Sequence, residues 1–347
     1  MICDFIVDGR KRPGNPETNR NIEMNAEQRI LTTAPIEKIA EQILSEYGVV
    51  ECAPDGREES LLPLLDNTVA IVVRGDGCAP TKVIEQAKQL RVIGRPGVGY
   101  DSGDIAAATA RGIPVVFTPG LGARAVAEGA LAMLMHIVKK VSFWDESLKS
   151  GNWKSRYETK SGDMEGSTLG IIGMGRIGSD LARMVQSFRM EVLGFDPFIS
   201  TEAAEELDVT LVDLQTLVER SDFICVHAPD NESTHGMINR ELLQQVKPGA
   251  IFVNAARGGL VESLEVLQEC LEDGRFSAIA LDVFPTEPPD VSHPIFSHPA
   301  CLTSPHAIAL THGSFLKIME TMAENMAAVL RGEKPKIEFV VNPEVLS

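Results

Sequence analysis

One stretch of the chain, residues 167–197, constrains the fold more than any other: STLGIIGMGRIGSDLARMVQSFRMEVLGFDP. It opens with a short apolar run at residues 169–172, which is typical of a strand buried on both faces. A G-x-G-x-x-G turn follows, then apolar residues at helical spacing, and finally a second apolar run that ends in Asp196. This order of strand, glycine turn, helix, strand and acid predicts a βαβ unit that binds a dinucleotide.

Each glycine of the turn has a physical role in such a unit. Gly173 permits the tight turn, Gly175 lets the backbone approach a pyrophosphate, and Gly178 lets the helix pack closely against the sheet. Free amides at the helix N-terminus, where Arg176 and Ile177 lie, then hold the phosphates. The side chain of Arg176 can assist the phosphates, or it can be a solvated surface arginine.

Asp196 lies about twenty residues beyond the glycines, at the end of the second apolar run. A carboxylate at this point accepts hydrogen bonds from the ribose hydroxyls and repels a 2′-phosphate, so the sequence predicts NAD rather than NADP. Glycine turns also occur without a ligand, and a purely structural βαβ unit is the alternative. The complete set of elements favours the dinucleotide.

The bulk composition limits the class of protein. A length of 347 residues suggests about two domains, and 44% apolar residues is ordinary for a globular protein. The net charge of −17 disfavours nucleic acid and anionic membranes as partners, because both require a basic surface. A locally basic site for an anionic substrate remains compatible with this charge.

The cysteines and the apolar runs indicate a cytoplasmic protein. The six cysteines are scattered without a C-x-x-C pair, which favours free thiols in a reducing compartment and gives no metal site. No signal sequence is recognisable at the start of the chain. The longest apolar stretch, residues 130–138, is too short to cross a bilayer and contains His136.

Strands and helices alternate along most of the chain, which predicts parallel sheets covered on both sides. Residues 1–27 are polar, and we expect a surface arm there. In the first part we expect strands at 30–32, 49–52, 69–73, 91–93 and 113–117, and helices at 35–47, 58–65, 79–88, 104–111 and 123–141. A loop at 149–166 leads into the nucleotide unit, after which we expect helices at 211–219, 240–245, 261–271 and 314–331, strands at 223–227, 250–254, 277–281 and 301–303, and a polar tail.

Two loops that follow strands of the first part are candidate substrate contacts. One contains Arg74 and Gly75, and the other contains Val98 and Gly99. Ligands of open α/β sheets gather at the carboxyl ends of the strands, so both loops face the expected crevice. The backbone amides of Val98 and Gly99 suit a small carboxylate. The alternative is that both segments are tight turns only.

Three side chains with catalytic chemistry follow three strands of the nucleotide unit: Arg257, Glu287 and His306. The guanidinium fork of an arginine matches a planar carboxylate, and a histidine beside a carboxylate can exchange a proton near neutral pH. Taken singly, each residue can instead have a purely structural role: Arg257 in a salt bridge, Glu287 at a helix cap and His306 in the core. Their common position beside a nucleotide site favours catalysis.

The motifs GRPGVGYDSGDI, GSTLGIIGMGRIG, VHAP, GAIFVNAARGGLV, ALDVFPTEP and TSPHAIAL follow one another in this order. With them the chain resembles, over residues 60–312, the D-isomer-specific 2-hydroxyacid dehydrogenases, which include D-lactate and D-3-phosphoglycerate dehydrogenases. The resemblance implies an α/β protein with two doubly wound parallel sheets. A Rossmann nucleotide domain, residues 123–312, would be inserted in a flavodoxin-like substrate domain, residues 1–122 and 313–347. It also implies hinge closure and a homodimer built around the long helix.

The same resemblance implies roles for individual residues. Arg257 would bind and polarise a 2-keto acid, His306 would be the acid–base group, and Glu287 would orient it. Asp282 would contact the nicotinamide amide, and His312 is the nearest rival to His306. Together with Arg257 and His306, the cofactor would be lined by His227, Ala228, Pro229, Thr234, Ala255 and Ala256.

Two departures from the family pattern stand out. Gly129 follows Glu128 where the family often has a polar group, so we expect no chemistry there. The chain ends soon after its last helix, so we expect no regulatory domain.

The expected function is NAD-dependent interconversion of a 2-keto acid and a D-2-hydroxy acid, a small-molecule substrate. The alternative is an NAD(H)-sensing binding protein of the corepressor type, without significant turnover.

Overall fold

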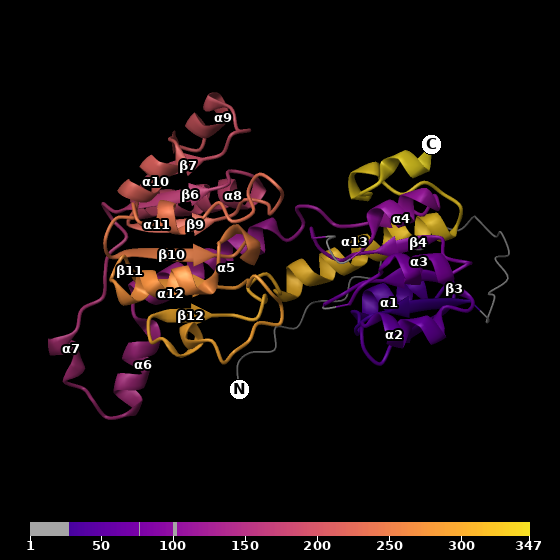
Figure 1. Ribbon diagram of the computed structural model, residues 1–347, viewed down its shortest axis with the longest axis horizontal. Coiled ribbons are helices and arrows are strands. Elements are labelled where there is room, and N and C mark those ends of the chain that lie inside the picture. Colours follow the sequence, from indigo (N-terminus) through magenta and orange to yellow (C-terminus); the bar gives the residue numbers. More distant parts are fainter. Residues whose placement is uncertain (1–27, 76, 100–102) are drawn as a thin grey trace, which may run out of the picture.

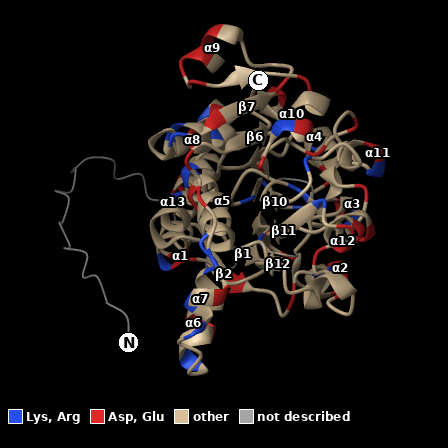
Figure 2. Ribbon diagram, turned by 90° about the vertical axis from the view of Figure 1, so that its left-hand side faces the viewer, with Lys and Arg blue, Asp and Glu red and all other residues tan. Residues whose placement is uncertain are grey.

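The computed structural model describes residues 28–75, 77–99 and 103–347, and the surface arm expected at residues 1–27 lies outside them. Two α/β domains lie side by side along the long axis of the molecule (Figure 1). The helix α5 (Ala123–Val138) packs on the second domain, and α13 (His312–Leu330) runs from between the domains along the first. Viewed along the long axis, acidic and basic residues are interspersed over the helices and loops (Figure 2). Among the described residues, no helix has the length and apolar character needed to cross a membrane.

The first domain contains a five-stranded parallel sheet in the order β2-β1-β3-β4-β5. Its strands are β1 (Arg29–Thr32), β2 (Val49–Cys52), β3 (Thr68–Val72), β4 (Val92–Gly94) and β5 (Val115–Val116). The helices α2 (Glu58–Leu61), α3 (Thr81–Gln86) and α4 (Ile105–Ala110) contribute to the core on one face, and α1 (Lys38–Leu44) and α13 contribute to the core on the other. Because both faces are covered, β3 is buried along its whole length.

The second domain contains a seven-stranded parallel sheet in the order β12-β11-β10-β9-β6-β7-β8. Its strands are β6 (Thr168–Ile172), β7 (Glu191–Phe195), β8 (Thr210–Leu211), β9 (Phe223–Val226), β10 (Ala250–Asn254), β11 (Phe276–Leu281) and β12 (Cys301–Thr303). Its helices are α8 (Arg176–Val185), α9 (Thr201–Glu205), α10 (Leu214–Arg220), α11 (Arg240–Leu243) and α12 (Leu264–Glu272), and α5 packs against α8. The strand order reverses between β6 and β9, which creates a crevice at the carboxyl ends of these two strands.

The segment after α5 differs from the expectation. Lys140 adopts a left-handed conformation, with φ of +50°, so α5 ends at Val138 and a separate helix α6 (Val141–Lys149) begins. The expected loop at residues 149–166 contains a further short helix, α7 (Ser155–Glu158). Its Arg156 stacks on the ring of Trp153, a local contact that periodicity does not reveal. The helices α6 and α7 project from the domain as an arm (Figures 1 and 2).

The helix expected at residues 211–219 also starts later. Residues 210–211 form the edge strand β8, and Asp213 caps α10 by accepting a hydrogen bond of 2.7 Å from the backbone N–H of Thr216. An aspartate at the N-cap satisfies a free amide and so sets the first residue of the helix. The expectation also lacked α9, which Ser200 caps in the same way.

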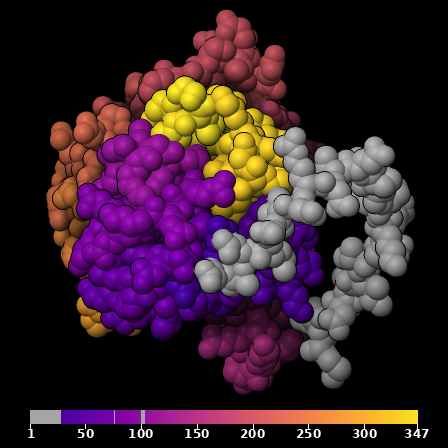
Figure 3. Space-filling view, turned by 90° about the vertical axis from the view of Figure 1, so that its right-hand side faces the viewer, coloured from indigo at the N-terminus to yellow at the C-terminus, as the bar shows by residue number. Residues whose placement is uncertain are grey.

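The C-terminal tail packs on the first domain, to which the sequence analysis assigned residues 313–347. Val340 pairs antiparallel with Val116 on the edge strand β5. Asn342 is buried, accepts a hydrogen bond of 2.8 Å from Val115 N–H, and donates one of 2.9 Å to Ile113 O. The tail satisfies backbone groups that an edge strand otherwise exposes, and the yellow C-terminal segment lies against the magenta part of the domain (Figure 3).

Candidate active site

The glycine turn lies between β6 and α8, as the sequence predicts, and each glycine has a distinct environment. Gly173 has φ of +95°, and a Cβ there would lie 2.5 Å from Ala228 N. A Cβ on Gly178 would lie 2.1 Å from the carbonyl oxygen of Gly173, so only glycine lets α8 approach the turn. A Cβ on Gly175 would meet nothing within 4 Å. The turn therefore leaves open space in front of the helix N-terminus, where phosphates bind.

Asp196 lies beside this turn, directly after β7. Its Oδ2 accepts a hydrogen bond of 2.8 Å from Met174 N–H within the turn, and its Oδ1 accepts one of 2.8 Å from Phe198 N–H. A carboxylate has about four acceptor positions, so both oxygens keep capacity for ribose hydroxyls. The two backbone bonds fix the carboxylate at the edge of the open space.

The first residues of α8 complete this side of the site. Arg176 is the first residue of α8, and its side chain extends to the segment that enters α5, because a Cβ on Gly120 would lie 2.9 Å from its Cδ. Ile177 is half-buried behind it and contributes to the core. Arg176 is exposed, as the alternative of a surface arginine expected, and it lies next to Gly120 in the chain crossing between the domains.

His227 follows β9, at the reversal of strand order, and is 8% exposed. Burial lowers the pKa of its imidazole to about 4. Within the described part of the chain, neither ring nitrogen has a hydrogen-bond partner. Buried polar groups are almost always paired, so an unpaired imidazole in a ligand crevice indicates a partner supplied by the ligand. The open glycine turn, Asp196 and this imidazole together fit a dinucleotide.

The loop after His227 is held by Thr234. Its hydroxyl donates a hydrogen bond of 2.6 Å to Pro229 O and accepts one of 2.9 Å from Asn231 N–H. Ala228 is buried against Gly173. The predicted cofactor residues 227–229 and 234 therefore belong to one ordered loop beside the glycine turn.

Arg257 follows β10 and is positioned by Asn254, the last residue of that strand. Asn254 is 1% exposed, donates a hydrogen bond of 2.9 Å to Arg257 O, and accepts one of 3.1 Å from Ala256 N–H. The Arg257 guanidinium donates a bond of 2.8 Å to Ala256 O, and Ala255 is buried beneath the turn. Asn254 was not among the site residues predicted from the sequence, although a polar residue that ends an apolar strand was a readable signal.

His306 and Glu287 are in direct contact. His306 Nδ1 lies 2.8 Å from Glu287 Oε2, and Glu287 Oε1 accepts a hydrogen bond of 3.0 Å from Phe284 N–H. An ionised carboxylate only accepts, so Nδ1 carries the hydrogen and Nε2 is left for a substrate. The geometry is that of a histidine whose tautomer is fixed by a carboxylate.

The charges of Glu287, His306 and Arg257 act on one another. The hydrogen bond to Glu287 raises the pKa of His306, although burial opposes the rise. Burial disfavours the charged form of Glu287, but the hydrogen bonds from His306 and Phe284 N–H outweigh it and lower the pKa of Glu287. The Arg257 cation adds to the lowering of the Glu287 pKa and opposes the rise of the His306 pKa, so the three groups share one electrostatic site.

Asp282 lies below His306 and is 2% exposed. Its Oδ1 accepts hydrogen bonds of 2.8 Å from Ala307 N–H and 3.3 Å from Ile308 N–H, and its carbonyl oxygen accepts one of 2.8 Å from His306 N–H. Burial raises the pKa of this carboxyl, and the bonds from the Ala307 and Ile308 amides oppose the rise. In the structure Asp282 holds the backbone that carries His306; its predicted contact with nicotinamide stays a prediction.

Gly258 brings the loops of Arg257 and Glu287 together. A Cβ on Gly258 would lie 1.9 Å from the backbone carbon of Phe284 and 2.3 Å from Pro285 N. Any side chain at this position would push the two loops apart. The proximity of Arg257 to the His306–Glu287 pair thus depends on this glycine.

The first domain contributes the two predicted substrate loops. Arg74 lies with its guanidinium carbon 4.6 Å from the ring centroid of Phe315 on α13, a cation–π contact, and donates a hydrogen bond to Pro35 O. Gly75 follows it with φ of +62°. This loop is therefore attached to the helix that crosses between the domains.

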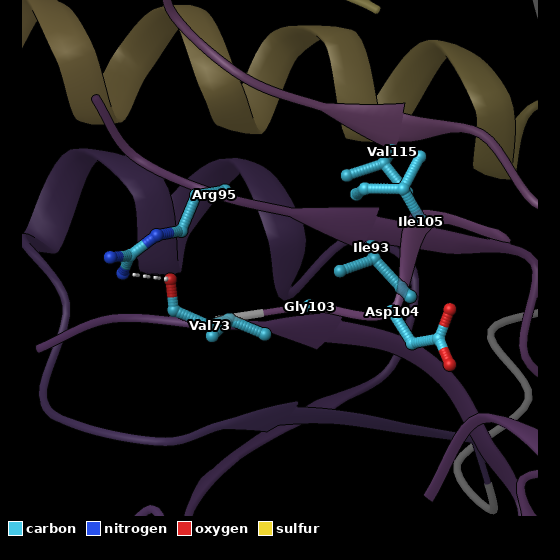
Figure 4. A pocket seen from close by; sticks show the side chains of 7 residues that line it. All are labelled: Val73, Ile93, Arg95, Gly103, Asp104, Ile105 and Val115. Atoms are coloured by element: carbon cyan, nitrogen blue, oxygen red, sulfur yellow. Dashed lines mark hydrogen bonds between the residues drawn. The ribbon is translucent and has the colours of Figure 1, made fainter. Parts of the chain in front are cut away.

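The loop with Val98 and Gly99 is held by Arg95. Arg95 donates hydrogen bonds of 3.0 Å to Gly99 O and 3.1 Å to Val73 O at the end of β3 (Figure 4). Arg95 and Val73 line a small pocket beside this loop, and the rest of its wall is formed by Ile93, Gly103, Asp104, Ile105 and Val115. Gly97 N–H donates a bond of 2.7 Å to the Thr118 hydroxyl, while Val98 is exposed.

His312, the rival acid–base residue, is the first residue of α13.

Comparisons with known proteins agree with this geometry. A family model described as the NAD-binding domain of D-isomer-specific 2-hydroxyacid dehydrogenases matches residues 131–307. The D-3-phosphoglycerate dehydrogenase of Archaeoglobus fulgidus is 38% identical over 305 residues, which is 88% of this chain and 58% of that protein. The chain spans between half and three fifths of the length of such curated relatives.

Solved structures cover both domains. A protein of Thermus thermophilus is 31% identical with a TM-score of 0.83, over 90% of this chain and 100% of that one. The D-lactate dehydrogenase of Aquifex aeolicus, solved in complex with NAD and lactic acid, is 25% identical with a TM-score of 0.81, over 91% and 99%.

Proposed function

This chain belongs to the D-isomer-specific 2-hydroxyacid dehydrogenases, and we propose that it interconverts a 2-keto acid and a D-2-hydroxy acid with NAD as the cofactor. The observation that supports this reaction best is the His306–Glu287 contact of 2.8 Å beside Arg257, on the same sheet as the glycine turn. A proton donor, a carboxylate anchor and a dinucleotide cradle are the parts that such a reaction requires.

In this proposal, different residues bind the substrate, transfer the proton and hold the cofactor. The fork of Arg257 binds the substrate carboxylate and polarises the 2-keto oxygen. His306 donates its Nε2 proton to that oxygen during reduction and accepts it back during oxidation, while Glu287 stabilises the protonated imidazole. When bound, NAD supplies the hydride chemistry. Gly173, Gly175 and the N-terminus of α8 would hold its phosphates, and Asp196 its ribose.

The first candidate substrate is the pair 3-phosphoglycerate and 3-phosphohydroxypyruvate. The curated relatives at 38% and 39% identity are D-3-phosphoglycerate dehydrogenases. Arg74 places a cation on the first domain, next to the crossing helix α13, where it can meet a second anionic group of the substrate. The amides of Val98 and Gly99 would contact the carboxylate from the same side.

We propose that the functional unit is a homodimer. Large apolar side chains gather on the arm: Val141, Phe143, Leu148, Trp153 and Tyr157 are between 40% and 71% exposed. A cluster of this kind on a projecting element is typical of a subunit contact. Light scattering of the wild type and of Leu148→Asp tests this: the variant should be monomeric.

We propose domain boundaries at residues 122/123 and 312/313. The two crossings are adjacent, because the Ser314 hydroxyl in α13 donates a hydrogen bond of 3.4 Å to Leu121 O. Side-by-side crossings form a hinge about which the first domain can close over the substrate and exclude water.

The decisive experiment is NADH oxidation, followed by absorbance, with 3-phosphohydroxypyruvate, hydroxypyruvate, pyruvate and glyoxylate. The reverse direction uses NAD with the D- and L-enantiomers of the matching hydroxy acids. We expect turnover with at least one acid, only with the D-enantiomer, and its near loss in His306→Gln. NADH binding without turnover of any acid would contradict the proposal and indicate a binding protein.

A further inference from the structure

Gly129 occupies an unfavourable place for a glycine. It lies near the middle of the sixteen-residue helix α5, where glycine is destabilising relative to alanine. Its neighbours explain its presence. A Cβ on Gly129 would lie 2.6 Å from Ile308 Cβ and 3.0 Å from Ile308 Cγ1 and Cδ1. The missing side chain leaves a notch in α5, and Ile308 fills it.

Ile308 belongs to the segment that carries His306. His306 has φ of +53°, a conformation that a residue other than glycine adopts only when its surroundings hold it there. On one side the segment is held by Asp282, which accepts hydrogen bonds from the N–H groups of Ala307 and Ile308. On the other side it is held by α5, because Ile308 packs into the core cluster that contains Ala127 and Ala130.

We propose that Gly129 and Ile308 form a positioning contact. The notch in α5 sets how closely residues 306–308 approach this helix, and so holds His306 against Glu287. The inference rests on the proposed function, in which His306 is the acid–base group. Its geometry is independent of substrate identity. Neither residue would touch the reacting atoms, so both are positioning residues.

The expected size of the effect follows from the distances. Ordinary carbon–carbon contacts are about 3.5–4.0 Å, so a methyl group on Gly129 must displace Ile308 by roughly 1 Å. A displacement of about 1 Å near the reacting groups can lower turnover about a hundredfold. We therefore expect Gly129→Ala to lower kcat roughly ten- to a hundredfold, with less than a threefold change in the Kd of NADH.

The test compares four variants of the full-length protein with the wild type. Gly129→Ala closes the notch, and Ile308→Ala partly empties it without adding a contact. The double variant Gly129→Ala/Ile308→Gly should recover at least half of the logarithmic loss in kcat, because glycine at position 308 removes all three close contacts, including the one to Cβ at 2.6 Å. Gly162→Ala is the control. It adds the same methyl group at an exposed position outside the site, where the nearest atoms are Val138 Cγ1 at 3.4 Å and Val138 O at 3.7 Å, and its kcat should equal that of the wild type.

A second measurement does not depend on turnover. The NMR titration of the His306 ring reports its contact with Glu287, the other charged groups that face it being Asp282 and Arg257. In Gly129→Ala and in Ile308→Ala the His306 pKa should fall below the wild-type value, and in Gly162→Ala it should not change. A lower melting temperature without a change in the His306 pKa would mean that Gly129 and Ile308 have only a structural role.

The outcomes separate the contact from the reaction. If both notch variants keep the wild-type kcat and the wild-type His306 titration, the positioning contact is wrong while the proposed reaction stands. If the wild type turns over no acid but the His306 titration shifts in the notch variants, the reaction is wrong and the contact stands. If the variants lose kcat and the double variant regains none of it, the contact is also refuted.

Discussion

Replacing His227 with leucine tests whether this residue destabilises the apoprotein and contributes to cofactor binding. In the described chain, both ring nitrogens of this buried residue lack a hydrogen-bond partner. Leucine has a similar size and no polar atoms. The change should therefore stabilise the apoprotein and weaken cofactor binding, because the unpaired group disappears along with the partner it offers to a ligand.

The magnitude follows from the burial. Leaving a buried polar group unpaired costs about 1–3 kcal/mol, and imperfect packing of leucine will cancel part of the gain. A net gain of about 1–2 kcal/mol corresponds to a rise in melting temperature of roughly 2–8 °C for a domain of this size. Loss of one hydrogen bond to the cofactor, about 0.5–1.5 kcal/mol, should weaken NADH binding roughly three- to tenfold.

The pH dependence gives a second signature of His227. Burial lowers its pKa from 6.5 to about 4, so the unfolded chain binds more protons than the folded one between these values. The free energy of unfolding should therefore fall as the pH drops from 6.5 towards 4, by about 3 kcal/mol in total, and this contribution should be constant above pH 6.5. His227→Leu should remove that contribution.

Thermal unfolding of both proteins from pH 4.5 to 8, with and without NADH, measures all three effects. Leucine should raise the melting temperature of the apoprotein at pH 7.5, flatten its dependence on pH, and reduce the stabilisation by NADH. A less stable apoprotein with unchanged NADH affinity would refute the reasoning, because His227 would then be an ordinary core residue.

Three further substitutions test the remaining roles. Asp196→Ala removes the carboxylate that repels a 2′-phosphate, so the preference for NADH over NADPH should narrow by at least tenfold; equal use of both cofactors by the wild type would overturn the assignment. Arg257→Lys keeps the charge but removes the fork, so kcat/KM for the acid should fall about a hundredfold or more with little change in NADH binding, and near-normal kinetics would make the arginine structural. The hydrogen bond to Glu287 raises the pKa of His306, so keto-acid reduction, which needs the protonated imidazole, should fall as the pH rises through that pKa. Glu287→Gln should move this fall to lower pH, and a profile identical to the wild type would assign the proton to another group.

Local sequence patterns were sufficient for the nucleotide unit. The glycine turn, the buried strands and Asp196 are adjacent in the chain, and their spacing follows from the geometry of one βαβ unit. Candidate catalytic side chains could likewise be selected because parallel strands end at one edge of a sheet. Arg257 and His306 each follow such a strand, and Glu287 lies on the loop after β11.

Short elements were harder to predict, because a few residues carry too little periodicity. The edge strand β8 has two residues, and α7 has four. The tail was expected only as a polar segment after the last helix, whereas Val340 pairs with β5, more than two hundred residues away in the chain. A pairing of this kind depends on which edge is exposed, and only the assembled sheet decides that.

By itself, the sequence determined which residues could bind a dinucleotide and exchange a proton, since these properties belong to side-chain chemistry and to spacing within single units. The tertiary structure decided how those residues meet. Gly258 lets the Arg257 and Glu287 loops touch, and Gly129 admits the segment that carries His306. In the sequence each is only a glycine, one of 29. The need for glycine arises from a neighbour distant in the chain, and packing at that distance has no signature in a single sequence.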